Sequence, residues 1–435
     1  MPDAALRAAS LAHALSVPLS PAPAFASRRA GGGRTTLLVL ADQRWGVVYQ
    51  RLQHLLARLA RHLDVIVVEE PVADDMAPGH LVASNPAAGV EVLVPHLPAR
   101  IARADGLALA AVAELLRDAL AERAVASPIA WFASPMPLPL LASLPVRAVV
   151  YDRRDDAGAA APEARSLRAE RDAALMARAD LVLTASPTLH KASSARHARA
   201  RFVADAIDAD HFDAGRLWER SVEAADAAAL HAGLPWPRLG WYGAIDERVD
   251  LALVEAVAAR RPDWQLVMAG PVLLPPGRAL PQRANLHWLG RQSWALLPYL
   301  QSQWDVCLLP IVRGPATRCH PPTRALEALA GGRPVVSTAL PDVVARLGGV
   351  VRTADGVDGF IAACEATLDE SPAERARRRD AGRVLARQGD WDAAAGRIWS
   401  WLAALAAAPA AEPAPAWPPQ QQRGGHGEPA RQVVG

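Results

Sequence analysis

The chain has 435 residues, of which 51% are hydrophobic, and its 47 basic and 45 acidic side chains leave a formal net charge of +2. At about 100–200 residues per domain, this length predicts two domains with tails. The charge balance argues against a nucleic-acid partner, which would need a marked basic excess. The three cysteines are scattered and indicate a reducing compartment, while the adjacent Cys319 and His320 have no partner at zinc spacing, so no metal site is predicted.

The amino end has little pattern. Residues 1–34 are expected to be a flexible leader. The uncharged run from Ala8 to Ser27, with Ala24 and Ala26 at a small-residue site, leaves a cleaved signal peptide as the alternative. The longest uncharged run, 124–146, is interrupted by prolines, so no membrane-spanning helix is predicted.

Residues 35–206 alternate strands with helices, which predicts a parallel, doubly wound sheet. The expected strands are 35–42, 64–71, 90–97, 129–134, 146–152, 180–186 and 200–206, and the expected helices are 47–61, 104–121 and 162–178.

Residues 207–237 show no clear strand and are expected to connect two domains. A second alternation over 238–390 predicts a second sheet of the same kind. Its expected strands are 238–245, 264–270, 285–290, 305–311, 333–338 and 348–353, and its expected helices are 250–260, one from Ser293, 322–331, 356–369 and 373–387. A tryptophan-rich helix, 391–407, then precedes a disordered tail, 408–435.

The segment Asp305–Thr338 carries the clearest chemistry. It predicts a buried strand, a loop, a helix opened by Pro321 and Pro322, and a second buried strand. Arg324 falls in the first helical turn, where a cation is unfavourable unless an anion binds the helix end. Glu327, one turn on, could accept hydrogen bonds from ribose hydroxyls. The alternative is that Arg324 and Glu327 form an ordinary exposed pair.

The stretch PPTRALEALAGGRPVVST within this segment resembles the donor-binding segment of GT-B glycosyltransferases of family 4, the "group 1" type found in bacterial polysaccharide synthesis. The order and spacing of WYGAIDERVDLALVEAVAARRPDWQLVMAGPV (241–272), NLHWLG (285–290) and LPYLQSQWDVCLLP (297–310) are similar to that family's second domain. QRWGVVYQRLQHLLARLA (43–60), VVYDRRDD (149–156) and ADLVLTAS (179–186) resemble the first. The resemblance implies two Rossmann-like domains facing across a cleft, with a carboxyl-terminal helix that packs back across the junction.

The resemblance also implies a reaction: transfer of a sugar from a nucleotide-diphosphate sugar to a saccharide or lipid-linked acceptor, with retention and without metal or cofactor. Gly243, Arg248, Thr323 and Arg324 would hold the donor diphosphate, and Glu327 the ribose. For Arg248, a surface pair with Asp246 or Asp250 is the alternative. The acceptor and cleft candidates, all in the first domain, are Arg44, Trp45, Gln50, Arg51, Asp152 and Asp155, the last two cleft-lining or structural. No catalytic base is assigned.

Two departures from the family pattern keep other functions open. Arg324 stands where relatives carry lysine, and DAIDADHF (205–212) lacks a glycine that relatives commonly have. A degenerate scaffold or regulatory protein is one alternative, and a nucleotide-sugar epimerase of the same fold is another. The leading expectation is a cytoplasmic enzyme with a peripheral contact to the inner membrane face.

Overall fold

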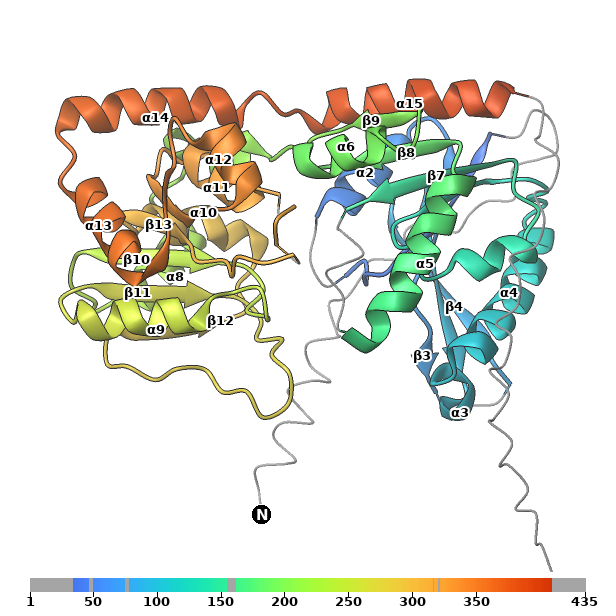
Figure 1. Ribbon diagram of the computed structural model, residues 1–435, viewed down its shortest axis with the longest axis horizontal. Coiled ribbons are helices and arrows are strands. Elements are labelled where there is room, and N and C mark those ends of the chain that lie inside the picture. Colours follow the sequence, from blue (N-terminus) through green and yellow to red (C-terminus); the bar gives the residue numbers. More distant parts are fainter. Residues whose placement is uncertain are drawn as a thin grey trace, which may run out of the picture.

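The computed structural model describes residues 34–46, 50–74, 78–154, 162–315, 317–319 and 321–408. These residues form two α/β domains that lie side by side, each with a parallel sheet covered by helices on both faces (Figure 1). The leader before Arg34, most of the predicted tail, and Asp155 lie outside the described residues.

The first domain is built on a sheet with the strand order β3-β5-β2-β1-β6-β7-β8-β9, in which only β4 runs antiparallel, against the outer side of β5. Most of its strands are apolar runs buried on both faces, as expected where helices cover both sides. The strands are β1 Thr36–Leu40, β2 Asp64–Val68, β3 Val72–Ala73, β4 His80–Ala87, β5 Val90–Leu97, β6 Ile129–Phe132, β7 Ala148–Arg153, β8 Leu181–Thr184 and β9 Ala200–Phe202.

The helices of this domain cover the two faces unequally. The α2 helix packs on one face, and α4, η1 and α5 cover the other. They are α2 Arg51–Leu59, α3 Ala99–Ala102, α4 Asp105–Glu122, η1 Leu138–Ala142, α5 Pro162–Arg178 and α6 Pro187–Ser194. The sequence analysis missed β4, because HLVASNPA is an edge strand of exposed and half-buried residues that lacks a regular apolar alternation.

The second domain has the strand order β12-β11-β10-β13-β14-β15, all parallel. Two apolar clusters, one on each face, form its core. The strands are β10 Arg238–Tyr242, β11 Gln265–Ala269, β12 Leu286–Gly290, β13 Val306–Leu309, β14 Val335–Thr338 and β15 Arg352–Ala354. The connection and helices are α7 Ala209–Phe212, η3 Ala214–Arg216, α8 Val222–Leu230, α9 Leu251–Arg260, η4 Trp294–Leu296, α10 Leu297–Ser302, α11 Thr323–Ala330, α12 Pro341–Leu347, α13 Gly356–Leu368 and α14 Pro372–Ala386.

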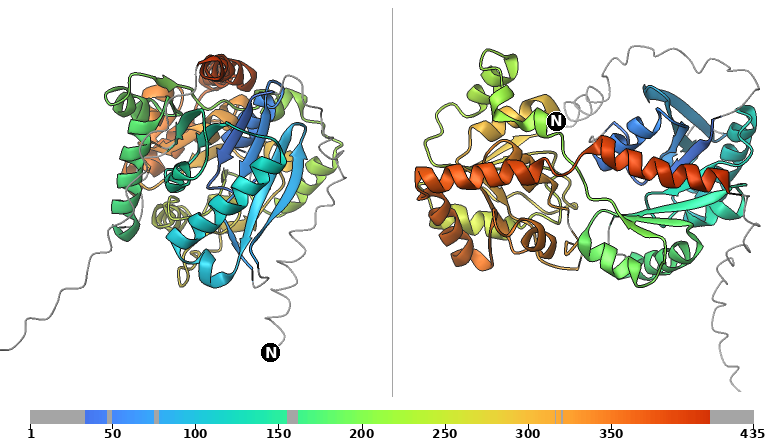
Figure 2. Two further views of the ribbon diagram at one scale, coloured as in Figure 1. Left: turned by 90° about the vertical axis from the view of Figure 1, so that its right-hand side faces the viewer. Right: turned by 90° about the horizontal axis from the view of Figure 1, so that it is seen from above.

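The carboxyl-terminal helix α15, Trp391–Ala407, returns to the first domain and packs on α2. Seen from above, α14 and α15 follow one another along the top of both domains (Figure 2). Asp392 forms an ion pair with Arg58 at 3.1 Å and accepts from Arg61 at 2.7 Å, and the ring centroids of Trp391 and His54 are stacked 4.8 Å apart. Among the described residues, no helix combines the length and hydropathy needed to span a membrane.

Close packing in the second core yields a first prediction. A Cβ added to Gly240 in β10 would lie 1.9 Å from the ring of Trp304, which is fully buried and donates from Nε1 to His231. Gly240→Ala is therefore expected to lower the free energy of unfolding by at least about 2 kcal/mol, measured by denaturant unfolding.

Gly359 in α13 supplies the matched control. Its added Cβ would meet only Ala354, at 3.6 Å, so Gly359→Ala should be neutral or stabilise by up to about 1 kcal/mol. Equal effects of the two substitutions would contradict the packing argument.

Candidate functional site

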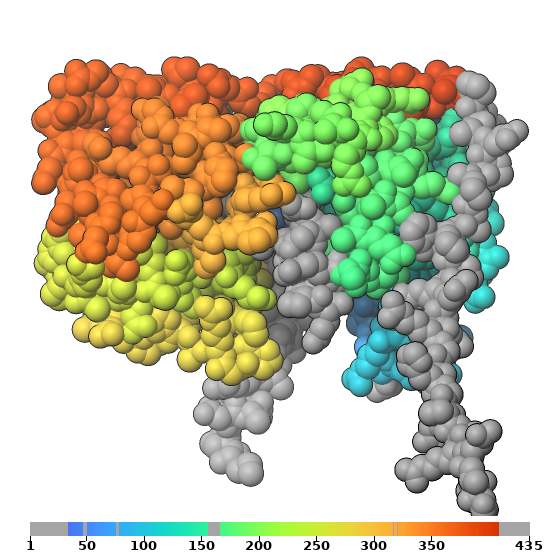
Figure 3. Space-filling view, viewed as in Figure 1, coloured from blue at the N-terminus to red at the C-terminus, as the bar shows by residue number. Residues whose placement is uncertain are grey.

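A cavity of about 290 Å³ lies between the two domains. Several residues that line it lie within three positions after the ends of β1, β8, β9, β10 and β13. The carboxyl ends of both sheets therefore open onto the cavity. In Figure 3 the second domain, yellow to orange, and the green part of the first domain lie side by side below α14 and α15 and touch each other. Among the lining residues are Asp42, Gln50, Arg51, His54, Arg154, Asp205, Asp208, Trp241, Gly243, Asp246, Arg248, Trp294, Thr323, Arg324, Glu327 and Trp391.

The carboxylate of Glu327 is the most constrained polar group of the second-domain wall. Its residue is 3% exposed, and it accepts from Arg324 Nη1 at 2.7 and 3.0 Å and from the Tyr242 hydroxyl at 3.0 Å. Gln301 donates to the Glu327 main-chain oxygen at 3.3 Å. Because a carboxylate can accept about four hydrogen bonds, Glu327 retains capacity for a ligand hydroxyl.

Tyr242 holds the Glu327 carboxylate without lining the cavity itself, and the sequence analysis did not name it. It ends β10 immediately before Gly243, and its ring lies beneath the Arg324 guanidinium at 5.3 Å. Burial, followed by the charge of Glu327, raises the pKa of the Tyr242 hydroxyl well above its usual value, so this hydroxyl is a donor at neutral pH. The sequence feature that could have indicated Tyr242 is its position at the end of a predicted strand, directly before Gly243.

Arg324 pairs with Glu327, but the pair is not an exposed one. The two side chains are 24% and 4% exposed. Burial alone would lower the pKa of Arg324, but Glu327 and Tyr242 outweigh burial and raise it, so the guanidinium is firmly charged. The surface-pair alternative is corrected in this respect, while the role of Arg324 in holding a diphosphate stays a prediction. Thr323, the first residue of α11, lines the cavity beside it.

Arg248 is held by Asp246, which is one of the pairings that the sequence analysis left open. The Arg248 guanidinium donates to Asp246 at 2.6 and 3.1 Å, and its side chain is 51% exposed. Asp250 instead caps α9 by accepting from the Leu253 amide. At Gly243, φ is +150° and an added Cβ would lie 2.5 Å from the Trp241 ring, so glycine is required by both conformation and packing.

Arg51 lies at the first-domain wall, in a buried ion cluster. It donates to Asp152 at 3.2 and 3.3 Å, to Asp205 at 2.7 Å and to the Val203 main-chain oxygen at 2.8 Å. Burial opposes its charge, but the two carboxylates outweigh burial and raise its pKa. Asp152 is 0% exposed, so of the two roles expected for it the structural one fits. The donors of Arg51 are likewise committed to the fold.

The remaining acceptor candidates differ in whether they line the cavity. Gln50 precedes α2 and lines the cavity. Arg44 and Trp45 do not line it, because the Arg44 side chain and the Trp45 amide both bind the Glu69 carboxylate, at 2.9 and 2.6 Å. An acceptor-side role for these two residues stays a prediction. Asp155 lies outside the described part of the chain.

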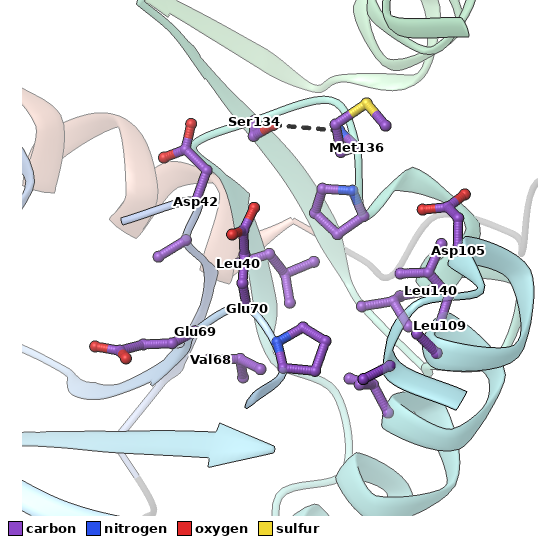
Figure 4. Close-up of a pocket in the computed structure, with 16 residues that line it drawn as sticks. Leu40, Asp42, Val68, Glu69, Glu70, Asp105, Leu109, Ser134, Met136 and Leu140 are labelled. Carbon is purple, nitrogen blue, oxygen red and sulfur yellow. Dashed lines mark hydrogen bonds between the residues drawn. The ribbon is translucent and has the colours of Figure 1, made fainter. Parts of the chain in front are cut away.

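A second cavity, of about 270 Å³, opens at the carboxyl end of the first sheet. Figure 4 shows an apolar side formed by Leu40, Val68, Leu109 and Leu140, with carboxylates around it. These carboxylates are Asp42, Glu69, Glu70 and Asp105. Asp42 pairs with Arg154, and Asp105 with Arg171 at 2.6 Å. Burial, followed by the charge of Asp42, raises the pKa of Glu70.

Comparison with known proteins identifies the fold and the second domain. Residues 237–370 match the family model described as Glycosyl transferases group 1, which confirms the sequence resemblance for that domain. A curated protein of Bacillus subtilis (strain 168), named "Putative teichuronic acid biosynthesis glycosyltransferase TuaH", is 26% identical over 230 residues. That match covers 50% of this chain and 55%, about half, of the relative.

Solved structures resemble nearly the whole chain. Sucrose-phosphate synthase from Thermosynechococcus elongatus has a TM-score of 0.66 and 17% identity, covering 85% of this chain and 100% of that one. An alpha,alpha-trehalose 6-phosphate synthase from Burkholderia multivorans has a TM-score of 0.63 and 14% identity, covering 86% and 100%. These likenesses confirm the predicted GT-B fold, with two doubly wound domains facing across a cleft.

The Arg51 cluster yields a second prediction. Arg51→Met would leave Asp152 and Asp205 buried without their cation, so a loss of about 3–5 kcal/mol in the free energy of unfolding is expected. Arg61→Met is the control, because Arg61 is 66% exposed and pairs with the surface carboxylate of Asp392, so less than about 1 kcal/mol should be lost. Denaturant unfolding of both variants measures the difference, and similar losses would contradict a structural role for Arg51.

His54 yields a pH prediction. Burial, then the charge of Arg58, lowers its pKa from 6.5 to about 4, while Asp208 acts in the opposite direction. Between these two values the unfolded chain binds a proton that folded His54 does not, so its contribution to stability falls as pH falls from about 6.5 to 4. His54→Phe keeps a ring against Trp391 and removes this term. Unfolding curves at several pH values should show the variant losing less stability than the parent on acidification, and parallel losses would refute the assignment.

Proposed function

We propose that the protein is a glycosyltransferase that moves a sugar from a nucleotide-diphosphate sugar to a saccharide or lipid-linked acceptor in cell-surface polysaccharide synthesis. The observation that carries the proposal is the cavity at the carboxyl ends of both sheets, where Arg248, Arg324 and Glu327 of the second domain face Gln50 and His54 of the first. The match to group 1 glycosyltransferases and the named role of the Bacillus subtilis relative support it.

The second domain takes the donor in this proposal. The leaving nucleoside diphosphate gains negative charge as the glycosidic bond breaks, and Arg248 and Arg324 stabilise it. Thr323 and the Gly243 main chain flank the phosphates, and Glu327 accepts from the ribose hydroxyls. The neutralising charge comes from arginine, so transfer at this site needs neither a divalent metal nor a cofactor. One solved structure of this fold is described as bound with UDP-2-fluoro glucose, and its TM-score to this chain is 0.64.

The first domain takes the acceptor. The apolar cavity beneath Asp42 and Glu70 adjoins the interdomain cavity, since Asp42 lines both. Carboxylates are suitable acceptors for sugar hydroxyls, and the apolar side suits the ring face of a saccharide or part of a lipid carrier. We propose retention at the sugar carbon, in line with the family resembled, and assign no catalytic base. The proposed location is the cytoplasm, with a peripheral contact to the inner membrane face for lipid-linked acceptors.

One observation favours a second candidate, a regulatory protein that retains the fold without transfer. Both arginines of the donor wall already pair with carboxylates of their own chain, Arg248 with Asp246 and Arg324 with Glu327. A site neutralised in this way could persist without a ligand. Nucleotide binding separates the two candidates.

Donor binding gives a fourth prediction. A thermal-shift screen against UDP, GDP, dTDP and their sugar conjugates should reveal a nucleotide that raises the melting temperature without added metal. At a hundredfold excess over its dissociation constant the ligand stabilises the fold by about 2.7 kcal/mol. Glu327→Gln, which preserves the side-chain shape but weakens acceptance from the ribose, should abolish most of the shift.

Glu247→Gln is the control, because Glu247 is an exposed carboxylate in the loop of Arg248 and does not line the cavity. It should retain the full shift. If no nucleotide stabilises a well-folded sample, the regulatory candidate replaces the enzyme. If the parent and Glu327→Gln bind a nucleotide equally, the ribose role of Glu327 is excluded.

A further inference from the structure

Three metal-binding side chains meet on adjacent strands of the first domain, at the end away from α15 (Figure 1). Asp74 follows β3, His96 lies in β5 and His80 begins β4. One potential ligand atom from each lies within 4.8 Å of the other two. None of the three lines either cavity described above, so this cluster is separate from the proposed transfer site.

Strand register explains the convergence. His80 and His96 are direct partners in the antiparallel pair β4·β5, so their side chains share one face of the sheet. On the other side of β5, His96 is the partner of Val72 in β3. Asp74 lies two residues beyond Val72 and therefore on the same face. The Asp74 amide donates to the Leu97 main-chain oxygen at 2.8 Å, which continues the ladder and fixes the position of Asp74.

The geometry is close to that of a metal site. His96 Nδ1 lies 2.9 Å from Asp74 Oδ2, and the rings of His80 and His96 are 5.1 Å apart, centroid to centroid. In a tetrahedral zinc site with bonds near 2.0–2.1 Å, neighbouring ligand atoms are about 3.3 Å apart. The three atoms lie within 4.8 Å of one another, so they need to approach by at most about 1.5 Å to reach this spacing.

The ligand set favours a transition metal over Ca²⁺ or Mg²⁺, and zinc is the ion that we propose. Two imidazoles and one carboxylate suit Zn²⁺, whereas Ca²⁺ and Mg²⁺ prefer sets made of oxygen. The Asp74 and His96 side chains are 26% and 24% exposed and His80 is exposed, so an ion can enter from solvent and keep water as a fourth ligand. We propose that Asp74, His80 and His96 form a zinc site that cross-links β3, β5 and β4.

The site would act on the wall of the acceptor-side cavity. Glu69, Glu70 and Pro71 line that cavity, and β3 follows them directly in the chain. Zinc bound by Asp74 and His96 would link the end of the segment 69–74 to β5. The ion thereby stabilises the edge of the sheet and holds the cavity wall in place, and it takes no part in bond breaking.

The experiment uses the full chain without a histidine tag, stripped of metal by a chelator that is then removed. Zn²⁺ is titrated in competition with a chromophoric zinc indicator, and Co²⁺ absorption reports tetrahedral coordination. The ligand variants are His80→Ala, His96→Gln and Asp74→Asn. The controls are His62→Gln, which removes a histidine elsewhere in the domain, and Val82→Ala, two residues along β4 on the same face as His80.

We expect about one zinc ion per chain, a higher melting temperature with zinc, and tetrahedral Co²⁺ bands. Each ligand variant should bind at least about tenfold more weakly, since losing even an outer-shell partner commonly has such an effect. Both controls should bind like the parent. Zinc binding that is absent, or that His80→Ala and His96→Gln leave unchanged, overturns the proposal and leaves Asp74 and His96 as an ordinary surface pair.

Discussion

The ion cluster around the buried guanidinium of Arg51 is the interaction that holds the first-domain side of the interdomain cavity together. It joins α2 to the end of β7 through Asp152 and to the segment leaving β9 through Asp205 and Val203. The same helix and the same segment supply Gln50, His54 and Asp208 to the cavity wall. Since an unpaired charge is costly in the interior, the cluster fixes the first-domain half of the site before any ligand arrives.

The two arginines of the other half differ in how readily they can change partners. Arg248 is half exposed and pairs with a carboxylate two residues away, an arrangement worth little in water. Arg324 is bound to a buried carboxylate that Tyr242 also holds. In the proposed donor site, exchanging Asp246 for a ligand phosphate therefore costs little, whereas Arg324 and Glu327 are held together as a pair. The proposed donor wall thus combines one half-exposed cation with one more buried cation.

The sequence predicted the fold well because long apolar strands alternating with helices allow few arrangements, and because the 305–338 segment is distinctive. It placed Glu327, Arg324 and Arg248 at one cavity. It missed β4, whose residues are exposed or half-buried, and it did not name Tyr242, which bonds to a carboxylate 85 residues further along the chain. Spacing alone also did not reveal that Glu69 binds both Arg44 and Trp45. The proximity of Asp74, His80 and His96 likewise depends on strand register, which cannot be read from a local sequence motif.

Within the described residues the polypeptide passes between the domains twice, once after β9 and once between α14 and α15. The two crossings touch, since a Cβ added to Gly389 would lie 3.1 Å from the Ala206 Cα. Thr188 of α6 also donates to Asp342 of α12 at 2.8 Å, so the domains are joined at more than one place. Ala206 directly follows Asp205, which Arg51 binds, so the point where the two crossings meet is held by the ion cluster of the first domain. We therefore expect a variant that breaks this cluster to loosen the position of one domain relative to the other as well as the first domain itself.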